Sequence, residues 1–291
     1  MFRGSIVALV TPMKADGAVD WEALERLIEW HVEEGTHGLV PMGTTGESAT
    51  LNTPEHLDVI RQTIAFAAGR IPVIAGTGSN STAESMHQTA EAARLGADAC
   101  LLVTPYYNRP TQEGLYQHYK AIADATDVPL LLYNVPPRTG CDLQPETVIR
   151  LAPLDAIVGI KEASGDPNRV TAILSQVPEG FVVLSGEDAL TLRMMELGAR
   201  GTISVTANVL PRMMSEFCEA FLNGDLKRAR DLDAQLQPIH QILFVETSPS
   251  PAKWALYEMG RIDRGIRLPL LELSEKHRPE LRARLKQVGA L

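Results

Sequence analysis

Cysteine is scarce in this chain, and its spacing excludes two classes of protein. Only three of the 291 residues are cysteine, at Cys100, Cys141 and Cys218. An odd number without a CxxC pair fits neither a disulfide framework nor a zinc site, and it indicates a reducing compartment. Histidines and carboxylates with metal-ligand spacing are also missing, so we expect no bound metal.

Positive charge and long apolar runs are also in short supply. The 27 Lys and Arg residues are outnumbered by 36 Asp and Glu residues, which gives a formal net charge of −9. This balance argues against binding to a nucleic-acid backbone or to an anionic membrane surface. No apolar stretch approaches the ~20 residues that span a bilayer, and the run at residues 6–10 is too short for a signal peptide. We therefore expect a soluble, cytoplasmic protein.

The chain does contain a repeated pattern of short apolar runs, each followed by a helical stretch. The runs recur about every 30 residues, the length of a βαβ unit. They begin near residues 6, 38, 72, 99, 129, 156, 181 and 201. Their nearly continuous apolarity indicates parallel strands covered on both faces. We predict a (β/α)8 TIM barrel, because the doubly wound alternative usually carries a GxGxxG turn that the first unit lacks.

Local patterns predict where the barrel ends and where two helices begin. Asn223-Gly224 interrupts the repeat, so we predict a catalytic barrel over residues 1–224 and a helical C-terminal region over residues 225–291. Thr53 is predicted to cap a helix ahead of Pro54. Ser81 and Glu84 have the spacing of a capping box.

Lys161 ends the sixth apolar run and is a candidate nucleophile. Side chains alternate along a strand, so Lys161 and Gly159 share the face that points into the barrel mouth, and Gly159 is expected to leave space beneath the lysine. Burial disfavours the charged form of an amine, and a neutral amine attacks a carbonyl to form a Schiff base. Position alone leaves a structural salt bridge with Glu162, or a phosphate contact, as alternatives.

Tyr133 and Arg138 follow the fifth run and supply two further chemical groups. A tyrosine hydroxyl beside an amine can relay protons, although a tyrosine at a strand end often only packs. An arginine in a proline-stiffened loop can bind a carboxylate with two hydrogen bonds, and a plain surface arginine is the alternative.

Three Gly- or Tyr-bearing segments follow other runs. The turn at residues 43–48 is predicted to expose backbone N–H groups and two hydroxyls as an anion cradle without net positive charge. Tyr106 and Tyr107 are adjacent and point opposite ways, so at least one is expected to contact something other than its own core. Gly186 makes the turn after the seventh run or allows close approach of a ligand.

Together these segments resemble the dihydrodipicolinate synthase family, Schiff-base enzymes of the N-acetylneuraminate lyase superfamily. Matching stretches occur in family order along the whole barrel, at residues 43–47, 104–108, 133–139, 159–163 and 201–205. Each stretch alone is common, but the set is specific. The resemblance implies condensation of pyruvate with L-aspartate 4-semialdehyde, the committed step of diaminopimelate and lysine biosynthesis, without a cofactor.

The resemblance also implies roles for individual residues. Lys161 would form the Schiff base with pyruvate, and Tyr133 would shuttle protons through a relay in which Thr44 links it to Tyr107. A neighbouring subunit supplies Tyr107 in this family, so a homo-oligomer is implied, a tetramer built as a dimer of dimers. The substrate-binding positions implied by the family are Thr45 for the pyruvate carboxylate, Ile203 through its carbonyl, Arg138 for the semialdehyde carboxylate, and Gly186 beside it.

The family further implies an L-lysine feedback site at a subunit interface. The positions that match it are Ser48, Ala49, His56, Asn80, Glu84 and Tyr106. Thr53 departs from the histidine usual in well-inhibited bacterial members, and one lost hydrogen bond of about 0.5–1.5 kcal/mol would weaken lysine binding up to roughly tenfold.

Two other functions fit parts of the pattern. Sialate lyases and sugar-acid aldolases share the lysine, the tyrosine and the Gly-rich turn, but they generally lack an arginine at the position of Arg138. A non-catalytic sensor of pyruvate or lysine would have no need of a proton relay through Tyr133, Thr44 and Tyr107. Arg138 therefore favours the synthase over the other aldolases, and the intact relay favours it over the sensor.

Overall fold

The computed structural model describes residues 2–291 and contains one eight-stranded sheet in the order β2-β1-β8-β7-β6-β5-β4-β3. A helix follows each strand along the chain, so the predicted (β/α)8 barrel is confirmed. All eight predicted runs begin within two residues of a strand start; the first begins two residues late because β1 includes Gly4 and Ser5. The strands are β1 (Gly4–Ala8), β2 (Gly38–Val40), β3 (Ile74–Gly76), β4 (Ala99–Val103), β5 (Leu130–Asn134), β6 (Ile157–Glu162), β7 (Val182–Ser185) and β8 (Gly201–Ser204).

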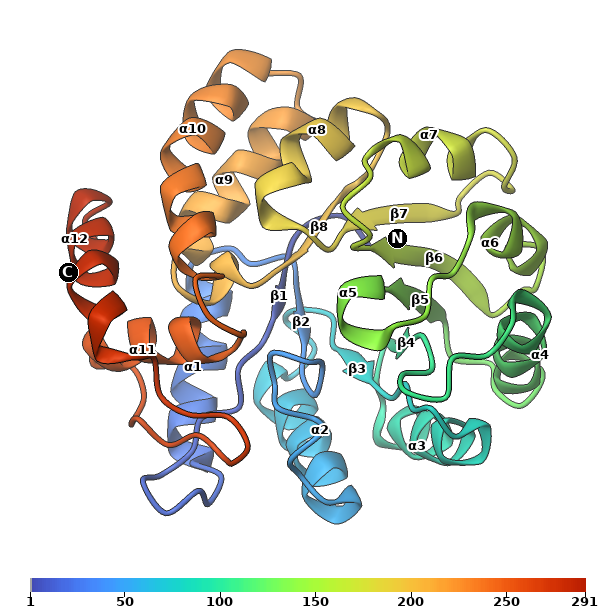
Figure 1. The fold of residues 1–291 in the computed structure, drawn as a ribbon, viewed down its shortest axis with the longest axis horizontal. Coiled ribbons are helices and arrows are strands. Elements are labelled where there is room, and N and C mark those ends of the chain that lie inside the picture. The colour runs from blue at the N-terminus through green and yellow to red at the C-terminus, as the bar shows by residue number, and fades with distance from the viewer. Residues whose placement is uncertain (1) are drawn as a thin grey trace. The chain divides into compact units, whose positions relative to one another are not determined.

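Helices alternate with these strands, and further helices follow the last one (Figure 1). The helices up to the eighth strand are α1 (Trp21–Glu33), α2 (Thr53–Ala67), α3 (Thr82–Leu95), α4 (Gln112–Ala123), α5 (Pro136–Thr139), α6 (Pro145–Leu151), α7 (Asn168–Leu174), the 3-10 turn η1 (Asp188–Leu190) and α8 (Thr191–Glu196). After it come η2 (Thr206–Asn208), α9 (Pro211–Leu222), α10 (Leu226–Ile242), α11 (Ser250–Glu258), η3 (Glu275–His277) and α12 (Arg278–Gln287).

The two predicted helix caps are each partly wrong. The cap of α2 is Asn52, which forms a complete capping box with Glu55, and Thr53 is the first helical residue. Ser81 does cap α3, but the Glu84 carboxylate accepts a hydrogen bond from Ser79 Oγ at 2.6 Å and does not bond back to the Ser81 N–H. Asn52, not Thr53, thus caps α2, and in α3 the Glu84 carboxylate binds Ser79 instead of closing the capping box.

The chain divides into two compact units, of which the first comprises residues 2–3 and 73–203. It contains β3 to β7, whose buried strands are flanked by α3, α4, α6 and α7 (Figure 1). Tyr119 of α4 is fully buried, and its hydroxyl donates to the Leu102 carbonyl at 3.3 Å. The unit therefore carries the strand ends that bear the candidate lysine and tyrosine.

One irregularity in the first unit sets the register of its central strands. Leu130 faces Ile157, but the next pair is Leu131 with Gly159, so Val158 is an extra residue in β6. Such a β-bulge shifts every later residue of its strand by one position relative to the partner. The consequence is that Tyr133 faces Lys161 and Asn134 faces Glu162.

The second unit comprises residues 4–72 and 204–291. The turn after β2 lies in it, as do the C-terminal helices, which pack on α9 and on one another. Its apolar core joins α1 to α11 and contains Val10, Ala23, Leu27, Trp30, Leu256 and Ile262. After residue 225, the described residues form helices and connecting segments only. The division at residue 224 into a barrel and a C-terminal region stays a prediction.

A buried ion pair connects α11 to the turn after β2. Lys253 Nζ lies 2.5 Å from Glu47 Oε1, and the two side chains are only 4% and 0% exposed. The second oxygen, Oε2, accepts from the Arg267 N–H at 3.1 Å. Burial lowers the pKa of Lys253, while the charge of Glu47 acts in the opposite direction. Removing one partner would leave a buried charge without compensation.

No helix within residues 2–291 combines the length and the apolarity needed to cross a membrane.

We predict that Lys253→Met lowers the free energy of unfolding by about 3–5 kcal/mol, because Glu47 would be left buried and unpaired. Denaturant unfolding measures this change. Lys227→Met is the matched control, since Lys227 forms an exposed pair with Asp231 and its loss should cost less than about 1 kcal/mol. Adding Glu47→Gln to Lys253→Met should recover part of the loss; equal losses at Lys253 and Lys227 would contradict the prediction.

Candidate active site

The structure brings Lys161 and Tyr133 together on adjacent strands. The two residues are direct partners in the β5–β6 register, and Lys161 Nζ lies 4.2 Å from the centroid of the Tyr133 ring. Only 6% of Lys161 and 7% of Tyr133 is exposed. Both residues sit near the carboxyl ends of their strands, which is where barrel enzymes carry their reacting groups. A buried amine next to a phenol is an arrangement suited to imine chemistry.

Two glycines shape the surroundings of Lys161, and one of them does so differently from the prediction. A Cβ on Gly159 would lie 2.5 Å from Val182 Cγ2 and 3.0 Å from Leu131 Cδ2. Gly159 therefore leaves no empty space, because the neighbouring strands already fill it. A Cβ on Gly186 would lie 2.6 Å from Ala163 Cβ and 3.0 Å from Lys161 Cε, so the lysine stem packs against that glycine.

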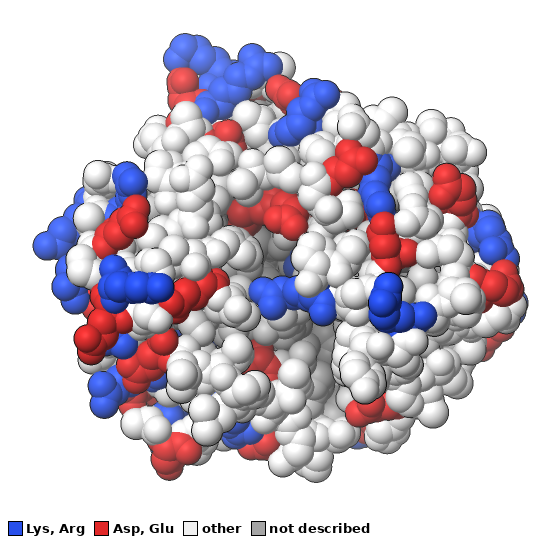
Figure 2. All heavy atoms as spheres, viewed as in Figure 1, with Lys and Arg blue, Asp and Glu red and all other residues white. Residues whose placement is uncertain are grey.

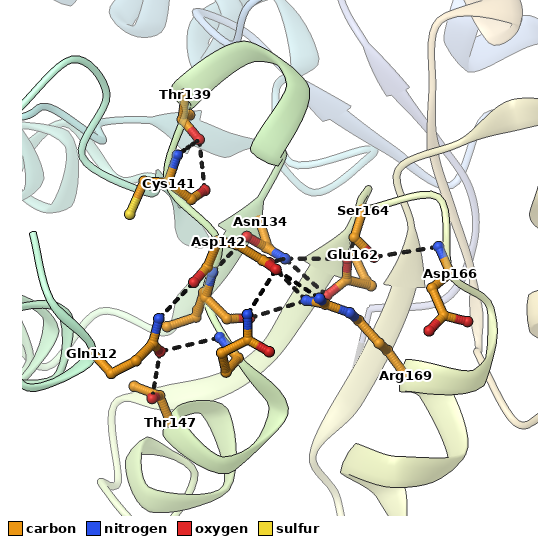
Figure 3. A network of polar contacts seen from close by, with 12 residues as sticks. Gln112, Asn134, Thr139, Cys141, Asp142, Thr147, Glu162, Ser164, Asp166 and Arg169 are labelled. Carbon is orange, nitrogen blue, oxygen red and sulfur yellow. Dashed lines mark hydrogen bonds and ion pairs between the residues drawn. The ribbon is translucent and has the colours of Figure 1, made fainter. Parts of the chain in front are cut away.

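The alternative of a structural salt bridge between Lys161 and Glu162 does not match the structure. The Glu162 carboxylate accepts from the Ser164 N–H at 2.7 Å and from Asn134 Nδ2 at 3.3 Å (Figure 3). Within residues 2–291, no ion pair joins it to Lys161. Neighbouring strand residues point to opposite faces, which separates the carboxylate from the amine.

Arg138 is an exposed residue of α5, which directly follows β5. Pro136 and Pro137 begin this short helix, and their fixed φ angles hold the loop in shape. The guanidinium makes no ion pair with a carboxylate of residues 2–291, so it can bind an anionic ligand. This arrangement supports the predicted carboxylate contact.

Glu187 is a charged neighbour that the sequence prediction missed. Burial and the charge of Asp188 raise the pKa of Glu187, while the positive charges of Lys161 and Arg138 act in the opposite direction. The two cations are therefore close enough to influence this carboxyl group. Only its position directly after Gly186 at the end of β7 could have indicated this.

The turn at residues 43–48, in the second unit, offers fewer N–H groups to an anion than predicted. The N–H groups of Gly46 and Ser48 donate to the Gly43 carbonyl at 3.1 and 3.4 Å, and that of Glu47 donates to the Thr44 carbonyl at 3.1 Å. These three groups are consumed within the turn. Among residues 2–291, the N–H groups of Thr44 and Thr45 have no acceptor. The Gly43 N–H likewise has no acceptor among these residues, so any backbone contact with an anion is limited to the N–H groups of residues 43–45, beside the two threonine hydroxyls.

Backbone strain marks the same turn. Glu47 has a φ of 60° and Met42 a φ of 58°, in the left-handed region that non-glycine residues rarely occupy. A Cβ on Gly46 would lie 2.9 Å from the Met42 nitrogen, so that position admits no side chain. Thr11 Oγ1 donates to the Gly46 carbonyl at 2.7 Å, and the buried Lys253–Glu47 pair holds the end of the turn. Such strain persists only where surrounding contacts enforce it.

Tyr106 and Tyr107, which follow β4, differ in exposure and in backbone conformation. Tyr107 is 90% exposed and has a φ of 72°, whereas Tyr106 is 41% exposed. Asn80 Nδ2 donates to the Tyr106 carbonyl at 3.1 Å, so these two residues of the predicted lysine site are in contact. The Glu84 carboxylate accepts a hydrogen bond from Ser79 Oγ, the residue before Asn80 in the chain.

The remaining predicted positions are distributed over both units. Ile203 is buried in β8 of the first unit, beside the rung that pairs Ser185 with Thr202. Ser48, Ala49 and His56 lie in the second unit, with His56 buried in α2. The roles predicted for all of these positions stay predictions.

Many charged side chains form exposed ion pairs, such as Arg61–Asp58. On the face shown in Figure 2, acidic side chains lie close to most of the basic ones, although basic side chains gather at its upper left edge. In the part of the chain that the structure describes, no three His, Cys, Asp or Glu side chains form a group that could hold a metal ion.

Comparison with known proteins identifies the family. The model of the dihydrodipicolinate synthetase family matches residues 1–288. The chain belongs to this family. It is 58% identical to the 4-hydroxy-tetrahydrodipicolinate synthase of Alcanivorax borkumensis over all 291 residues, which cover 99% of that protein.

Solved structures of family members match the whole fold. The dihydrodipicolinate synthase from Acinetobacter baumannii, crystallised with pyruvate, has 54% identity and a TM-score of 0.98, with complete coverage of both chains. The enzyme from Cyanidioschyzon merolae, crystallised with lysine bound, has 38% identity and a TM-score of 0.96, covering 100% of this chain and 99% of that one. The family resemblance inferred from the motifs is thus confirmed.

Proposed function

We propose that this chain condenses pyruvate with L-aspartate 4-semialdehyde to give 4-hydroxy-tetrahydrodipicolinate, which makes it a lyase of lysine and diaminopimelate biosynthesis. The observation that carries the proposal is the buried Lys161 amine, 4.2 Å from the centroid of the Tyr133 ring, in a chain of this family. Pyruvate is the ligand named for the Acinetobacter baumannii relative. The names of the relatives give the product, 4-hydroxy-tetrahydrodipicolinate.

The first half of the proposed reaction takes place on Lys161. Its amine attacks the ketone carbon of pyruvate to give a carbinolamine, and loss of water leaves a protonated imine. The imine withdraws electrons from the neighbouring methyl group, which loses a proton and gives an enamine. Tyr133 is the proposed donor and acceptor of these protons, because its ring adjoins the amine.

The second half joins the two substrates. The enamine carbon attacks the aldehyde carbon of the semialdehyde, and the aldehyde oxygen takes up a proton. The substrate amine then adds to the imine carbon and displaces Lys161, which closes the ring and regenerates the enzyme. We assign the semialdehyde carboxylate to Arg138, whose exposed guanidinium makes no internal ion pair with residues 2–291. The protonated imine serves as the electron sink.

Roles for the other predicted residues are part of the same proposal. Thr45 would bind the pyruvate carboxylate, and its unused N–H supports this assignment. Thr44 and Tyr107 would complete the proton relay, and the Ile203 carbonyl and Gly186 would line the site. Tyr107 is 90% exposed, which suits a side chain that serves a neighbouring subunit in a homotetramer. A cytoplasmic location, expected from the composition, belongs to the proposal as well.

Incubation with pyruvate followed by borohydride reduction is expected to label Lys161 covalently, because reduction converts the imine into a stable secondary amine. Peptide mapping by mass spectrometry locates the label, and Lys161→Met should remain unlabelled. Absence of label on wild-type Lys161 would exclude every Schiff-base function. Turnover with aspartate semialdehyde, compared with N-acetylmannosamine, then separates the synthase from a sialate lyase.

Arg138→Ala should retain labelling by pyruvate and lose turnover of the semialdehyde. Loss of hydrogen bonds to a charged carboxylate, worth roughly 1.5–3 kcal/mol, corresponds to a fall in kcat/KM for the semialdehyde of about 10- to 100-fold. Arg150→Ala, which removes another partly exposed arginine of the first unit, is the control. Unchanged semialdehyde turnover in Arg138→Ala would assign the arginine another role.

Inhibition by L-lysine is proposed to be present but weakened, with Thr53 in place of the usual histidine. Lysine is the ligand named for the Cyanidioschyzon merolae relative, and two predicted site residues, Asn80 and Tyr106, are in contact here. Initial rates titrated against L-lysine measure the effect, and Thr53→His should strengthen it up to roughly tenfold. A rate that is unaffected by millimolar lysine would contradict a feedback site.

A further inference from the structure

A polar network lies directly behind the pair formed by Lys161 and Tyr133. The next rung of the same two strands pairs Asn134 with Glu162, and both side chains are buried. Successive side chains of a strand point to opposite faces, so this rung faces away from the lysine and the tyrosine. The network on that face is drawn in Figure 3.

Asn134 is the centre of this network, and all of its side-chain hydrogen-bonding groups are engaged. Its Nδ2 donates to Asp142 Oδ1 at 3.0 Å and to both carboxylate oxygens of Glu162 at 3.3 Å. Its Oδ1 accepts from the Leu143 N–H at 2.9 Å. One amide thus ties β5 to β6 and to the segment that leads into α6.

Arg169 of α7 completes the network from the outside. Its guanidinium donates to Asp142 Oδ1 and Oδ2 at 2.7 Å each, and the arginine side chain is only 16% exposed. These hydrogen bonds hold the pKa of Asp142 below its usual range. The same positive charge acts on Glu162, whose pKa is raised by burial. The arginine therefore compensates two carboxyl groups at once.

The register that places Lys161 opposite Tyr133 depends on the bulge at Val158. Without this extra residue, the pairing of Leu130 with Ile157 would continue one-to-one and bring Ile160 opposite Tyr133. A shift of one residue also turns every later side chain of the strand to the other face. The contact between Asn134 and Glu162 forms only in the bulged register, so it stabilises that register specifically.

We propose that Asn134, Glu162 and Arg169 are positioning residues, which hold β5 and β6 in the bulged register and thereby fix the Lys161 amine beside the Tyr133 ring for imine formation. The proposal rests on the proposed function of Lys161. The three residues act through the strands, since Asn134 and Glu162 occupy the rung next to the reacting pair and face the opposite side.

The test compares Arg169→Met and Glu162→Gln with Arg150→Met. Glu162→Gln keeps an acceptor for the Ser164 N–H but places an amide donor against Asn134 Nδ2. Arg150→Met removes an arginine whose ion pair with Glu113 lies on the surface of the same unit. For each protein, the rate of pyruvate-imine formation is measured by timed borohydride trapping and divided by the number of sites trapped at saturation.

We expect Arg169→Met and Glu162→Gln to slow imine formation per trapped site by about tenfold or more, because small misplacements of reacting groups are costly. Arg150→Met should stay within about twofold of wild type, the size of an exposed ion-pair effect. The KM for the semialdehyde should also stay close to the wild-type value, since Arg138 is untouched. Arg169→Lys, which keeps the charge but loses the two-nitrogen fork, should be intermediate.

A purely structural role would lower the amount of folded protein and leave the rate per trapped site unchanged. Wild-type rates per site in Arg169→Met and Glu162→Gln would therefore overturn the proposal. If either variant fails to fold, Arg169→Lys decides the question in the same way. Failure of wild-type Lys161 to be trapped at all would instead refute the proposed function, so the two failures are distinguishable.

Discussion

The constraint on which the candidate site depends is the pairing of β5 with β6. A lysine becomes useful as a nucleophile only when its amine is buried and has a proton donor beside it, and both conditions come from one rung of a sheet. Lys161 and Tyr133 are neighbours because one extra residue, Val158, shifts β6 along its partner. The proposed imine chemistry thus depends on a detail of strand register.

Charge is used in two contrasting ways in this protein. Most ion pairs lie on the surface, where solvent and salt weaken them, and they contribute little individually. Lys253 with Glu47 is different because both side chains are buried, and Arg169 with Asp142 is partly shielded from water. Both hold a segment that carries candidate site residues, so the buried charges act mainly through the geometry that they impose.

The sequence predicted the fold well because each strand is short, apolar and separated from the next by about 30 residues. It also predicted that Lys161 and Tyr133 lie at strand ends. What it could not predict depends on contacts between distant segments. Alternation along β6 suggested space at Gly159, but Val182 and Leu131 fill that position.

The missed features have the same physical origin. The hydrogen bonds within the turn at residues 43–48 depend on its folded backbone, and the cap at Asn52 and the bond from Ser79 to Glu84 depend on local geometry. The pKa of Glu187 is raised by burial and by the adjacent Asp188, but the opposing charges of Lys161 and Arg138 come from residues that are distant in sequence. Spacing along a chain carries no information on such encounters.

The ion pair between Glu47 and Lys253 has a consequence for how the protein is made. Its two partners are 206 residues apart, so the strained turn of the second unit receives its buried counter-charge only after another 206 residues have been synthesised. Chains emerge from the ribosome at a limited rate, N-terminal parts first. A nascent chain that has completed its eighth strand at Ser204 therefore still lacks this support for the turn that bears Thr44 and Thr45.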